Sequence, residues 1–314
     1  MSLFRGKILV VRGGAIGDFI LTLPVLSALR RQFPEAWLEV LGYPHIVPLA
    51  MEGGLVHGVR SIEARALAGF FARHGELDED LIDYFSDFDL ILSYLYDPDG
   101  IFQENVCKCS TGQFIPGPHR PEESEGLHAT KVFLKSLERL AIFDPDAVPR
   151  LLFSSSPTDC QRLAVHPGSG SESKNWPENK WAELLGQLVE TSSLDLLIVG
   201  GEAEGGKLQR LAAPLPAARV GLAQSLPLTD LARQLAQCSV FVGHDSGISH
   251  LAAALGLPGV LLWGETPAEI WRPPSEEMVL VHSNEGLASL EVSQVMQALG
   301  QVCGDKVPGR PGRS

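Results

Sequence analysis

A lone aspartate follows three glycines near the start of the chain, where an apolar segment gives way to a helical pattern. The stretch 10–34 reads VVRGGAIGDFILTLPVLSALRRQFP and places Gly13, Gly14 and Gly17 just before Asp18. Glycines lack a Cβ, so the backbone there can turn tightly and approach a ligand. The Asp18 carboxylate could cap the helix that follows, or it could accept a proton from a substrate hydroxyl. The local sequence leaves both interpretations open.

These glycines do not form a dinucleotide-binding fingerprint. They read G-G-x-x-G, whereas that fingerprint requires G-x-G-x-x-G and an acidic residue at the end of the next strand. A nicotinamide-dependent oxidoreductase is therefore disfavoured.

A second loop collects residues that bind anions. The stretch 166–177, HPGSGSESKNWP, follows an apolar segment and contains glycines, serines and one lysine, Lys174. Backbone N–H groups and small hydroxyls in such a loop form a concavity for phosphate oxygens, and a lysine adds a positive charge. The loop is not a P-loop, because Ser173 stands where that motif has glycine. We favour a phosphate site here over a polar surface loop.

A third candidate lies in VFVGHDSGISHLAAALG, residues 240–256, where Asp245, Ser246 and Gly247 separate an apolar strand from an alanine-rich helix. The first N–H groups of a helix attract a pyrophosphate. Asp245 or Ser246 could simply cap the helix. A carboxylate beside a phosphate is better explained if Asp245 binds something else, such as sugar hydroxyls. His250 is interpreted first as a core histidine.

Other polar residues follow predicted strands. Glu202 and Glu204 in GGEAEGG could hold a ribose diol or could be surface glutamates, and Thr266 falls at the same edge. Two D-x-D sequences, 97–99 and 144–146, have proline in the middle, which is typical of turns rather than of metal ligands. We expect no metal site.

Composition narrows the class of protein. The chain has 314 residues, 45% of them hydrophobic, and a formal net charge of −13, which argues against a nucleic-acid-binding protein. Its five cysteines are scattered and odd in number, as expected of free thiols in a reducing compartment. The first apolar run is too short for a signal sequence, and no run approaches the ~20 residues needed to span a bilayer. We expect a soluble, cytoplasmic protein.

The elements that must position these residues alternate between short apolar strands and amphipathic helices, the pattern of a parallel sheet covered on both faces. The pattern restarts after a polar segment at 153–161, which predicts two α/β domains, 1–155 and 156–303, followed by a disordered tail at 304–314. Strands are predicted at 7–11, 36–42, 89–95, 162–168, 194–201, 240–245 and 259–264, and helices include 18–33, 125–142, 179–190, 228–238 and 249–256.

Five of these stretches, taken together and in order, resemble glycosyltransferase family 9, the ADP-heptose:lipopolysaccharide heptosyltransferases. They are RGGAIGDFILTLPVLSALRRQFP, LHATKVFLKSLERLAI, HPGSGSESKNWP, VGHDSGISHLAAALGLP and LLWGETPAEIW. The resemblance spans nearly the whole chain. It implies a GT-B architecture, two facing Rossmann-like domains with parallel sheets and an inter-domain cleft. It also implies inverting transfer of a sugar without a metal, an EC 2.4 activity.

The resemblance also implies roles for single residues. Asp18 would be the general base, beside an acceptor loop of Gly13, Gly14 and Gly17. A carboxylate across from the donor can take the proton of an acceptor hydroxyl, which favours the base over the cap. The nucleotide-sugar donor would lie on the C-terminal domain. Its predicted binding residues are Ser169, Gly170, Lys174, Glu204 (with Glu202 as the alternative), Leu226 at the adenine, Asp245, Ser246 and Gly247.

The implied partners are ADP-heptose and a glycan or lipopolysaccharide-precursor acceptor, with peripheral contact to the inner membrane surface and no further cofactor. An anionic lipopolysaccharide core favours a basic N-terminal domain, yet residues 1–150 contain 14 Lys and Arg against 21 Asp and Glu. Two other classes stay open, a nucleotide-sugar epimerase of the same shape and a non-catalytic nucleotide-sugar-binding protein.

Overall fold

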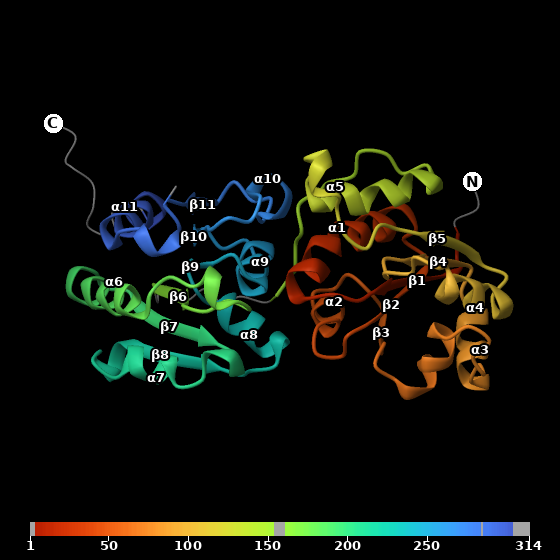
Figure 1. The fold of residues 1–314 in the computed structure, drawn as a ribbon, viewed down its shortest axis with the longest axis horizontal. Helices are drawn as coiled ribbons and strands as arrows, with labels where there is room; N and C mark the ends of the chain where they lie inside the picture. The colour runs from red at the N-terminus through yellow and green to blue at the C-terminus, as the bar shows by residue number, and fades with distance from the viewer. Residues whose placement is uncertain (1–3, 154–160, 284, 304–314) are drawn as a thin grey trace. The chain divides into compact units, whose positions relative to one another are not determined.

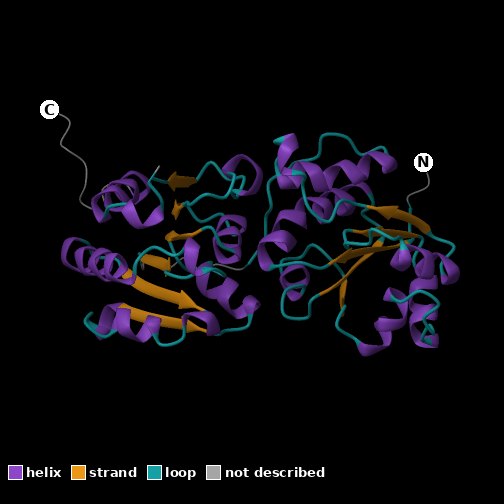
Figure 2. Cartoon of the chain, viewed as in Figure 1, coloured by secondary structure: helices purple, strands orange, loops and turns teal. Residues whose placement is uncertain are grey.

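The computed structural model describes residues 4–153, 161–283 and 285–303, which form two compact units, 1–152 and 153–314 (Figure 1). The predicted domain junction at residue 155 and the predicted tail at 304–314 lie outside the described residues, as does most of the predicted linker. Figure 2 shows that each unit alternates strands with helices, as the sequence pattern predicts.

The N-terminal unit contains a fully parallel sheet of five strands in the order β3-β2-β1-β4-β5. The strand order reverses between β1 and β4, and the apolar run of β1, Ile8 to Val11, pairs with β2 on one side and with β4 on the other. The strands are β1 (Lys7–Arg12), β2 (Trp37–Gly42), β3 (Gly58–Ser61), β4 (Leu90–Ser93) and β5 (Gln113–Pro116).

Helices cover both faces of this sheet. Right-handed crossovers place α1 and α2, which connect β1 to β2 and β2 to β3, on one face of the sheet. The connections that contain α3 and α4 cross the sheet in the opposite direction, so these helices cover the other face. Leu9 and Val11 of β1 pack with Phe85 of α3 and Phe102 of α4 in one buried cluster. The helical segments are α1 (Ile16–Gln32), α2 (Pro48–Glu52), α3 (Glu79–Ser86), α4 (Ile101–Cys109) and α5 (Ala129–Leu134), with 3-10 turns η1 (Arg65–Phe71), η2 (Glu123–Glu125) and η3 (Lys135–Leu140).

The helix predicted at 125–142 is wrong in its extent. The α-helix α5 covers only Ala129–Leu134 and continues as the 3-10 helix η3. The Ser136 hydroxyl donates to the carbonyl of Phe133, a local bond that competes with the helical pattern, and the turn ends at Ala141 with a φ of 56°.

The C-terminal unit has six parallel strands in the order β11-β10-β9-β6-β7-β8, and its order reverses between β6 and β9. Trp176 and Trp181 are fully buried in the core between this sheet and the helices α6 and α11. The strands are β6 (Arg162–His166), β7 (Asp195–Gly200), β8 (Val220–Gln224), β9 (Val240–His244), β10 (Gly259–Leu262) and β11 (Met278–Val281). The helical segments are η4 (Glu172–Lys174), α6 (Glu178–Thr191), η5 (Glu202–Glu204), α7 (Lys207–Ala212), η6 (Ala217–Arg219), α8 (Leu228–Leu235), α9 (Gly247–Ala254), α10 (Ala268–Trp271), η7 (Leu287–Ser289) and α11 (Val292–Cys303).

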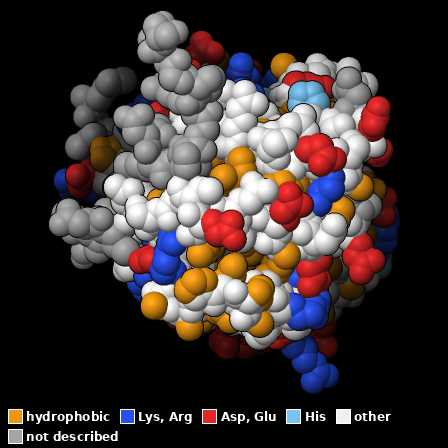
Figure 3. Space-filling model, turned by 90° about the vertical axis from the view of Figure 1, so that its left-hand side faces the viewer, with side chains coloured by type: hydrophobic (Ala, Val, Ile, Leu, Met, Phe, Trp, Pro, Cys, Tyr) orange, Lys and Arg blue, Asp and Glu red, His pale blue; other side chains and the backbone are white. Residues whose placement is uncertain are grey.

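Surface features agree with the composition. The face of the C-terminal unit in Figure 3 mixes hydrophobic side chains with scattered acidic and basic ones. Cys107, Cys109, Cys238 and Cys303 form no disulfide, and Cys160 lies outside the described residues. Among the described residues, no helix combines the length and the apolar character that crossing a membrane requires.

Candidate functional site

Both sheets place their candidate residues at the carboxyl ends of the two strands where the strand order reverses. In open α/β sheets this is where ligands bind. In the N-terminal unit these ends are Arg12 of β1 and Ser93 of β4, and in the C-terminal unit they are His166 of β6 and His244 of β9.

In the N-terminal unit, Asp18 is the third residue of α1 and not its cap. The N-cap is Ala15, whose backbone N–H donates to Oδ2 of Asp18 at 3.0 Å. The interpretation of Asp18 as the N-cap residue is therefore wrong, although its carboxylate does satisfy the N-cap N–H, as in a capping box. The Asp18 side chain remains 31% exposed, so a ligand can reach it.

The side chain of Arg12 lies beside this carboxylate on its buried side. Its guanidinium is nearly completely buried, and one of its nitrogens lies 3.7 Å from Oδ1 of Asp18. Nη2 also donates to the Asp18 carbonyl at 3.2 Å, while Nη1 donates to the carbonyls of Tyr94 at 3.3 Å and His119 at 2.9 Å. The ring of Phe133 lies 4.6 Å from the guanidinium carbon. Burial lowers the Arg12 pKa, and the Asp18 charge opposes this shift.

Gly14 makes room for the carboxylate. Its φ is +93°, and a Cβ added there would lie 2.9 Å from Oδ2 of Asp18. The sequence interpretation assigned this space to an acceptor, whereas the Asp18 carboxylate itself borders it. Gly13 differs, because its added Cβ would meet the side chains of Leu95, at 3.4 Å, and Tyr43, at 3.9 Å, and no atom of Asp18 within 4 Å. Gly17 lies in the first turn of α1.

In the C-terminal unit, a polar cluster joins three separate loops. Nζ of Lys174, after β6, lies 2.6 Å from Oδ2 of Asp245, after β9. The hydroxyl of Thr266, after β10, donates to the same oxygen at 2.7 Å. Asp245 is largely buried, with 12% of its side chain exposed, whereas Lys174 is 42% exposed. A lysine and hydroxyls at the ends of adjacent parallel strands can bind an anion and sugar hydroxyls.

The start of α9 borders this cluster. Ser246 is the N-cap residue, and its hydroxyl accepts a hydrogen bond from the Ser249 N–H at 3.4 Å and lies 3.2 Å from Nδ1 of His166. Gly247 is the first residue of the helix. The serine is thus both a cap and part of the polar surface. His250 is buried within α9, as the sequence predicts.

His244 holds the loop after β6 in place. Nε2 of His244 accepts the Trp176 N–H at 2.8 Å, and Nδ1 lies 3.2 Å from the carbonyl of Gly168. This pair of bonds requires the neutral tautomer with its proton on Nδ1. Burial lowers the pKa of His244 to about 4, which keeps the ring neutral at physiological pH.

A cavity of about 470 Å³ adjoins the same loop, and it contains Ser169, Gly170 and Glu204 in its lining. Oε2 of Glu204 accepts the Gly201 N–H at 2.6 Å, and an added Cβ at Gly168 would overlap Oε1. Glu204 therefore reaches the cavity from η5, whereas Glu202 is exposed and outside its lining. The remaining lining residues are Gly168, Ser171, Glu172, Asn175, Trp176, Pro177, Glu178, Lys207 and Arg210.

Not every predicted residue reaches this cavity. Leu226 lies half-buried in the turn between β8 and α8 and is outside the lining, as are Lys174, Asp245, Ser246 and Gly247. The structure therefore separates a charged cluster around Lys174 from the cavity beside Glu204, and the loop 168–175 borders both.

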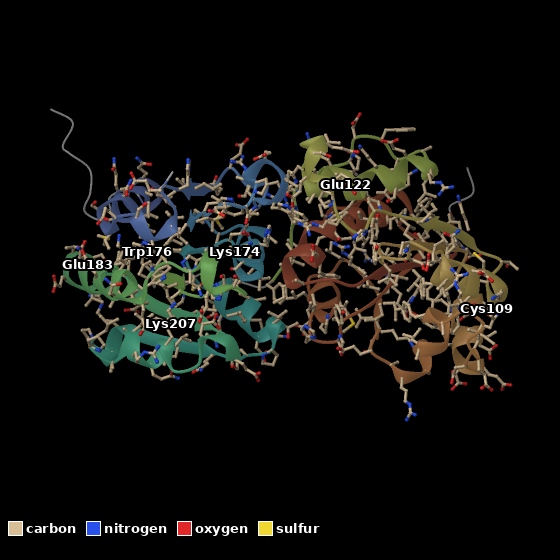
Figure 4. All side chains as sticks on the ribbon, in the orientation of Figure 1. Cys109, Glu122, Lys174, Trp176, Glu183 and Lys207 are labelled. Carbon is tan, nitrogen blue, oxygen red and sulfur yellow. The ribbon has the colours of Figure 1, made fainter. Side chains whose placement is uncertain are left out.

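Sequence reasoning missed Arg12 and Lys207, and it singled out His244 only as a departure from the family pattern, with no role. Nζ of Lys207 donates to the Pro167 carbonyl at 2.7 Å, and mainly burial lowers its pKa. Figure 4 shows Lys174 and Lys207 arising from different elements, η4 and α7. A polar side chain at the end of a buried strand was the available signal for Arg12 and His244. For Lys207, the only signal in the sequence was the pair of glycines before it.

The two D-x-D sequences form turns or caps. Asp97 accepts the N–H groups of Phe102 and Gln103 at the start of α4, and Asp144 adopts a φ of 47°. Among the described residues, no three or more His, Cys, Asp or Glu side chains gather in a way that could hold a metal ion.

Two parallel-sheet α/β units, the second with Lys174, Asp245 and Thr266 in contact at its switch point, define a protein built from two Rossmann-like domains. The chain belongs to glycosyltransferase family 9 (heptosyltransferase), whose family model matches residues 143–299. Its architecture is the GT-B fold of that family.

Three similar proteins illustrate the relationship. "Lipopolysaccharide heptosyltransferase 1" of Escherichia coli K12 is 31% identical over 158 residues, which cover 50% of this chain and 49% of that protein. "Lipopolysaccharide heptosyltransferase 3" of the same strain is 23% identical over 304 residues, covering 84% of each chain. The structure described as "E. coli heptosyltransferase WaaC with ADP" has a TM-score of 0.75 at 19% identity, and the match covers 94% of this chain and 99% of that one. The matches to the first curated relatives span about half of their length.

Proposed function

We propose that the chain is an inverting, metal-independent glycosyltransferase that moves heptose from ADP-heptose to a hydroxyl of a lipopolysaccharide core or another glycan acceptor. Family membership supports the reaction class, and the names of the relatives support the donor and the acceptor. The observation on which the proposal chiefly rests is the cluster of Lys174, Asp245 and Thr266 at the switch point of the C-terminal unit.

The leaving diphosphate takes up negative charge as the glycosidic bond breaks. In our proposal, Lys174 leaves Asp245 to bind this diphosphate, together with Ser169, Gly170 and the N–H groups at the start of α9, beginning with Gly247. Their positive charge and dipoles stabilise the leaving group and need no metal for that purpose. Asp245, released from Lys174, then accepts hydrogen bonds from hydroxyls of the donor sugar.

The nucleoside part of the donor would occupy the region of the cavity beside Glu204. A carboxylate can accept two hydrogen bonds from a ribose diol, and Oε1 of Glu204 is not used by the Gly201 N–H. Leu226 is proposed to contact the adenine. Because it lies outside the cavity lining, that role requires the base to extend beyond the cavity.

Asp18 is proposed as the general base. Inversion requires the acceptor hydroxyl to attack the anomeric carbon from the side opposite the diphosphate, and a carboxylate must take the hydroxyl proton as the new bond forms. The partial exposure of Asp18 and its support by Arg12 suit that role. The acceptor loop of Gly13, Gly14 and Gly17 is proposed to border the reacting hydroxyl. Because such an acceptor is linked to a lipid, we propose that the enzyme works in the cytoplasm, in peripheral contact with the inner membrane.

Calorimetric titration with ADP, UDP and GDP tests the donor site first. We expect selective binding of ADP to the wild-type protein and at least about tenfold weaker binding to Lys174→Ala, because a charge-assisted contact to phosphate is lost. The exposed Lys131→Ala variant, in the N-terminal unit, is the matched control and should bind ADP normally. A preference for UDP or GDP would overturn the heptose assignment, and binding of none of them would overturn the donor site.

Turnover is tested separately. Incubation with ADP-heptose and a heptose-deficient lipopolysaccharide extract, with and without EDTA, should release ADP at equal rates and give a product with an inverted anomeric centre. Loss of activity in EDTA that added metal restores would contradict metal independence. Retention of configuration would contradict the role proposed for Asp18.

A further inference from the structure

A second cavity lies in the N-terminal unit, at the carboxyl ends of β4 and β5. Its volume is about 210 Å³, and its lining includes Tyr96, Gln103 and His119. It is smaller than the roughly 300–1,000 Å³ typical of sites for drug-sized ligands, so it has room for about one sugar ring.

An exposed aromatic wall borders this cavity. The Tyr96 side chain is among the most exposed of the large hydrophobic residues, at 71%, and its ring centroid lies 4.7 Å from that of His119. Both rings line the cavity, so together they offer a ligand an aromatic surface beside polar groups. The apolar C–H face of a pyranose packs on such rings, while its hydroxyls reach polar groups such as the Gln103 amide.

The cavity is physically tied to Asp18 through Arg12. The buried guanidinium donates to the carbonyl of His119, which lines the cavity, and to that of Tyr94, beside it in the chain. The same guanidinium donates to the Asp18 carbonyl at the first turn of α1. One rigid group therefore fixes the loops after β4 and β5 against the start of α1. A ligand in the cavity would be held at a defined position relative to the Asp18 carboxylate.

The charge of the cavity indicates what kind of sugar it accepts. Its lining contains Asp97 but no lysine or arginine. The Asp97 carboxylate accepts two backbone N–H groups of α4, so it is fixed in place. The next cation along the chain, Arg120, forms an ion pair with Glu123 at 2.8 Å. An anionic group in the cavity would meet a carboxylate and no lysine or arginine in its lining.

We propose that this cavity is a subsite for one uncharged sugar ring of the acceptor, with Tyr96 and His119 as its stacking surface and Gln103 as its hydrogen-bonding group. The proposal rests on the proposed transferase function and adds the place and the chemistry of acceptor recognition. It explains how an N-terminal unit with a net negative charge can recognise a glycan.

Saturation-transfer NMR tests the subsite with methyl α-glycosides of glucose, galactose and mannose as neutral probes and glucuronate as the anionic probe. We expect saturation of at least one neutral glycoside by the wild-type protein and roughly fivefold weaker binding to Tyr96→Ala. Phe143→Ala removes an aromatic side chain that is similarly exposed, at 67%, in the same unit but outside the cavity, and it should bind as the wild type does.

His119→Ala is the second variant, because it keeps the carbonyl that Arg12 contacts while removing the ring. Thermal unfolding of each variant shows that it is folded. Absence of saturation with every neutral glycoside, or equal saturation in Tyr96→Ala, would overturn the subsite, and a preference for glucuronate would overturn its neutrality. ADP titration of the same samples keeps the two proposals apart, since normal ADP binding without glycoside binding leaves the donor site standing.

Discussion

A nitrogen of the buried Arg12 guanidinium lies 3.7 Å from Oδ1 of Asp18, whose other carboxylate oxygen accepts the Ala15 N–H. One oxygen of the proposed base is thus committed to the start of α1. The other oxygen lies beside the guanidinium of Arg12, which is almost completely buried. Arg12 and Asp18 therefore hold the first turn of α1 in place and at the same time orient the carboxylate that we propose as the general base.

Replacement of Arg12 by methionine should lower both stability and turnover. The guanidinium satisfies the carbonyls of Tyr94, His119 and Asp18, so its loss should reduce the free energy of unfolding by about 3 kcal/mol. Arg12→Lys should recover part of the stability but less of the turnover, since an ammonium cannot reproduce the planar fork. Urea unfolding and ADP release from ADP-heptose measure the two effects. Equal turnover in Arg12→Lys and the wild type would refute a need for the guanidinium.

Asp18→Asn separates the base from the helix contact. The amide oxygen of asparagine can still accept the Ala15 N–H, so stability and ADP binding should stay near the wild-type values. Turnover should fall about 10²- to 10⁴-fold, because an amide cannot accept the acceptor proton. Asp18→Ala should also lose about 1 kcal/mol of stability with that contact. If Asp18→Asn turned over like the wild type, the carboxylate would have only a structural role.

Gly14→Ala tests whether the space beside Asp18 matters. The added Cβ would lie 2.9 Å from Oδ2 of Asp18 at a φ of +93°, so the carboxylate must shift. We expect a stability loss of about 1–2 kcal/mol and a drop in turnover. Gly54→Ala is the matched control, because its φ of +74° imposes similar strain with no atom within 4 Å. The control should lose stability alone, and equal losses of turnover in both variants would count against a local effect on Asp18.

Short-range patterns were enough to predict the central strands and the loops at their carboxyl ends. They did not predict β3, β5, β8 or β11, because these strands are only four or five residues long and none of them is buried along its whole length. Arg12 escaped notice for another reason. Its partners Tyr94 and His119 lie 82 and 107 residues away, and no local pattern reports contacts at that separation. His244 likewise contacts Trp176 across 68 residues.

Stability should depend on pH through His244 and His166. Burial lowers their pKa values to about 4 and about 3 from an ordinary 6.5. Below pH 6.5, these two histidines therefore bind protons in the unfolded chain but stay neutral in the folded protein until the pH nears their lowered pKa values. The stabilisation by neutral His244 is complete above pH 6.5 and is lost as the pH falls towards 4, a change of about 3 kcal/mol.

Urea unfolding between pH 7.5 and 4 measures this loss. His244→Asn keeps a donor and an acceptor but does not titrate, so its stability should fall less steeply over the same range. The contribution of His166 should remain in both proteins. Parallel pH profiles for the variant and the wild type would mean that His244 is not held neutral by the fold.

Gly168→Ala tests the position of Glu204 without removing its charge. An added Cβ would overlap Oε1 of Glu204, and Oε2 is bound to the Gly201 N–H, so the carboxylate must leave one contact or move the loop. We expect ADP binding to weaken about tenfold, with binding of inorganic pyrophosphate less affected, because the change falls on the proposed ribose contact and spares Lys174.

Gly186→Ala, within α6, is the matched control for Gly168→Ala. Its added Cβ meets no atom within 4 Å, so it should leave both affinities unchanged. Glu204→Gln completes the comparison, since it keeps the size of the side chain while removing the charge. If Glu204→Gln weakened ADP binding and Gly168→Ala did not, the charge of Glu204 would matter but its position against Gly168 would not. If neither variant weakened ADP binding, the ribose would lie elsewhere, and the cavity beside Glu204 would have no part in donor recognition.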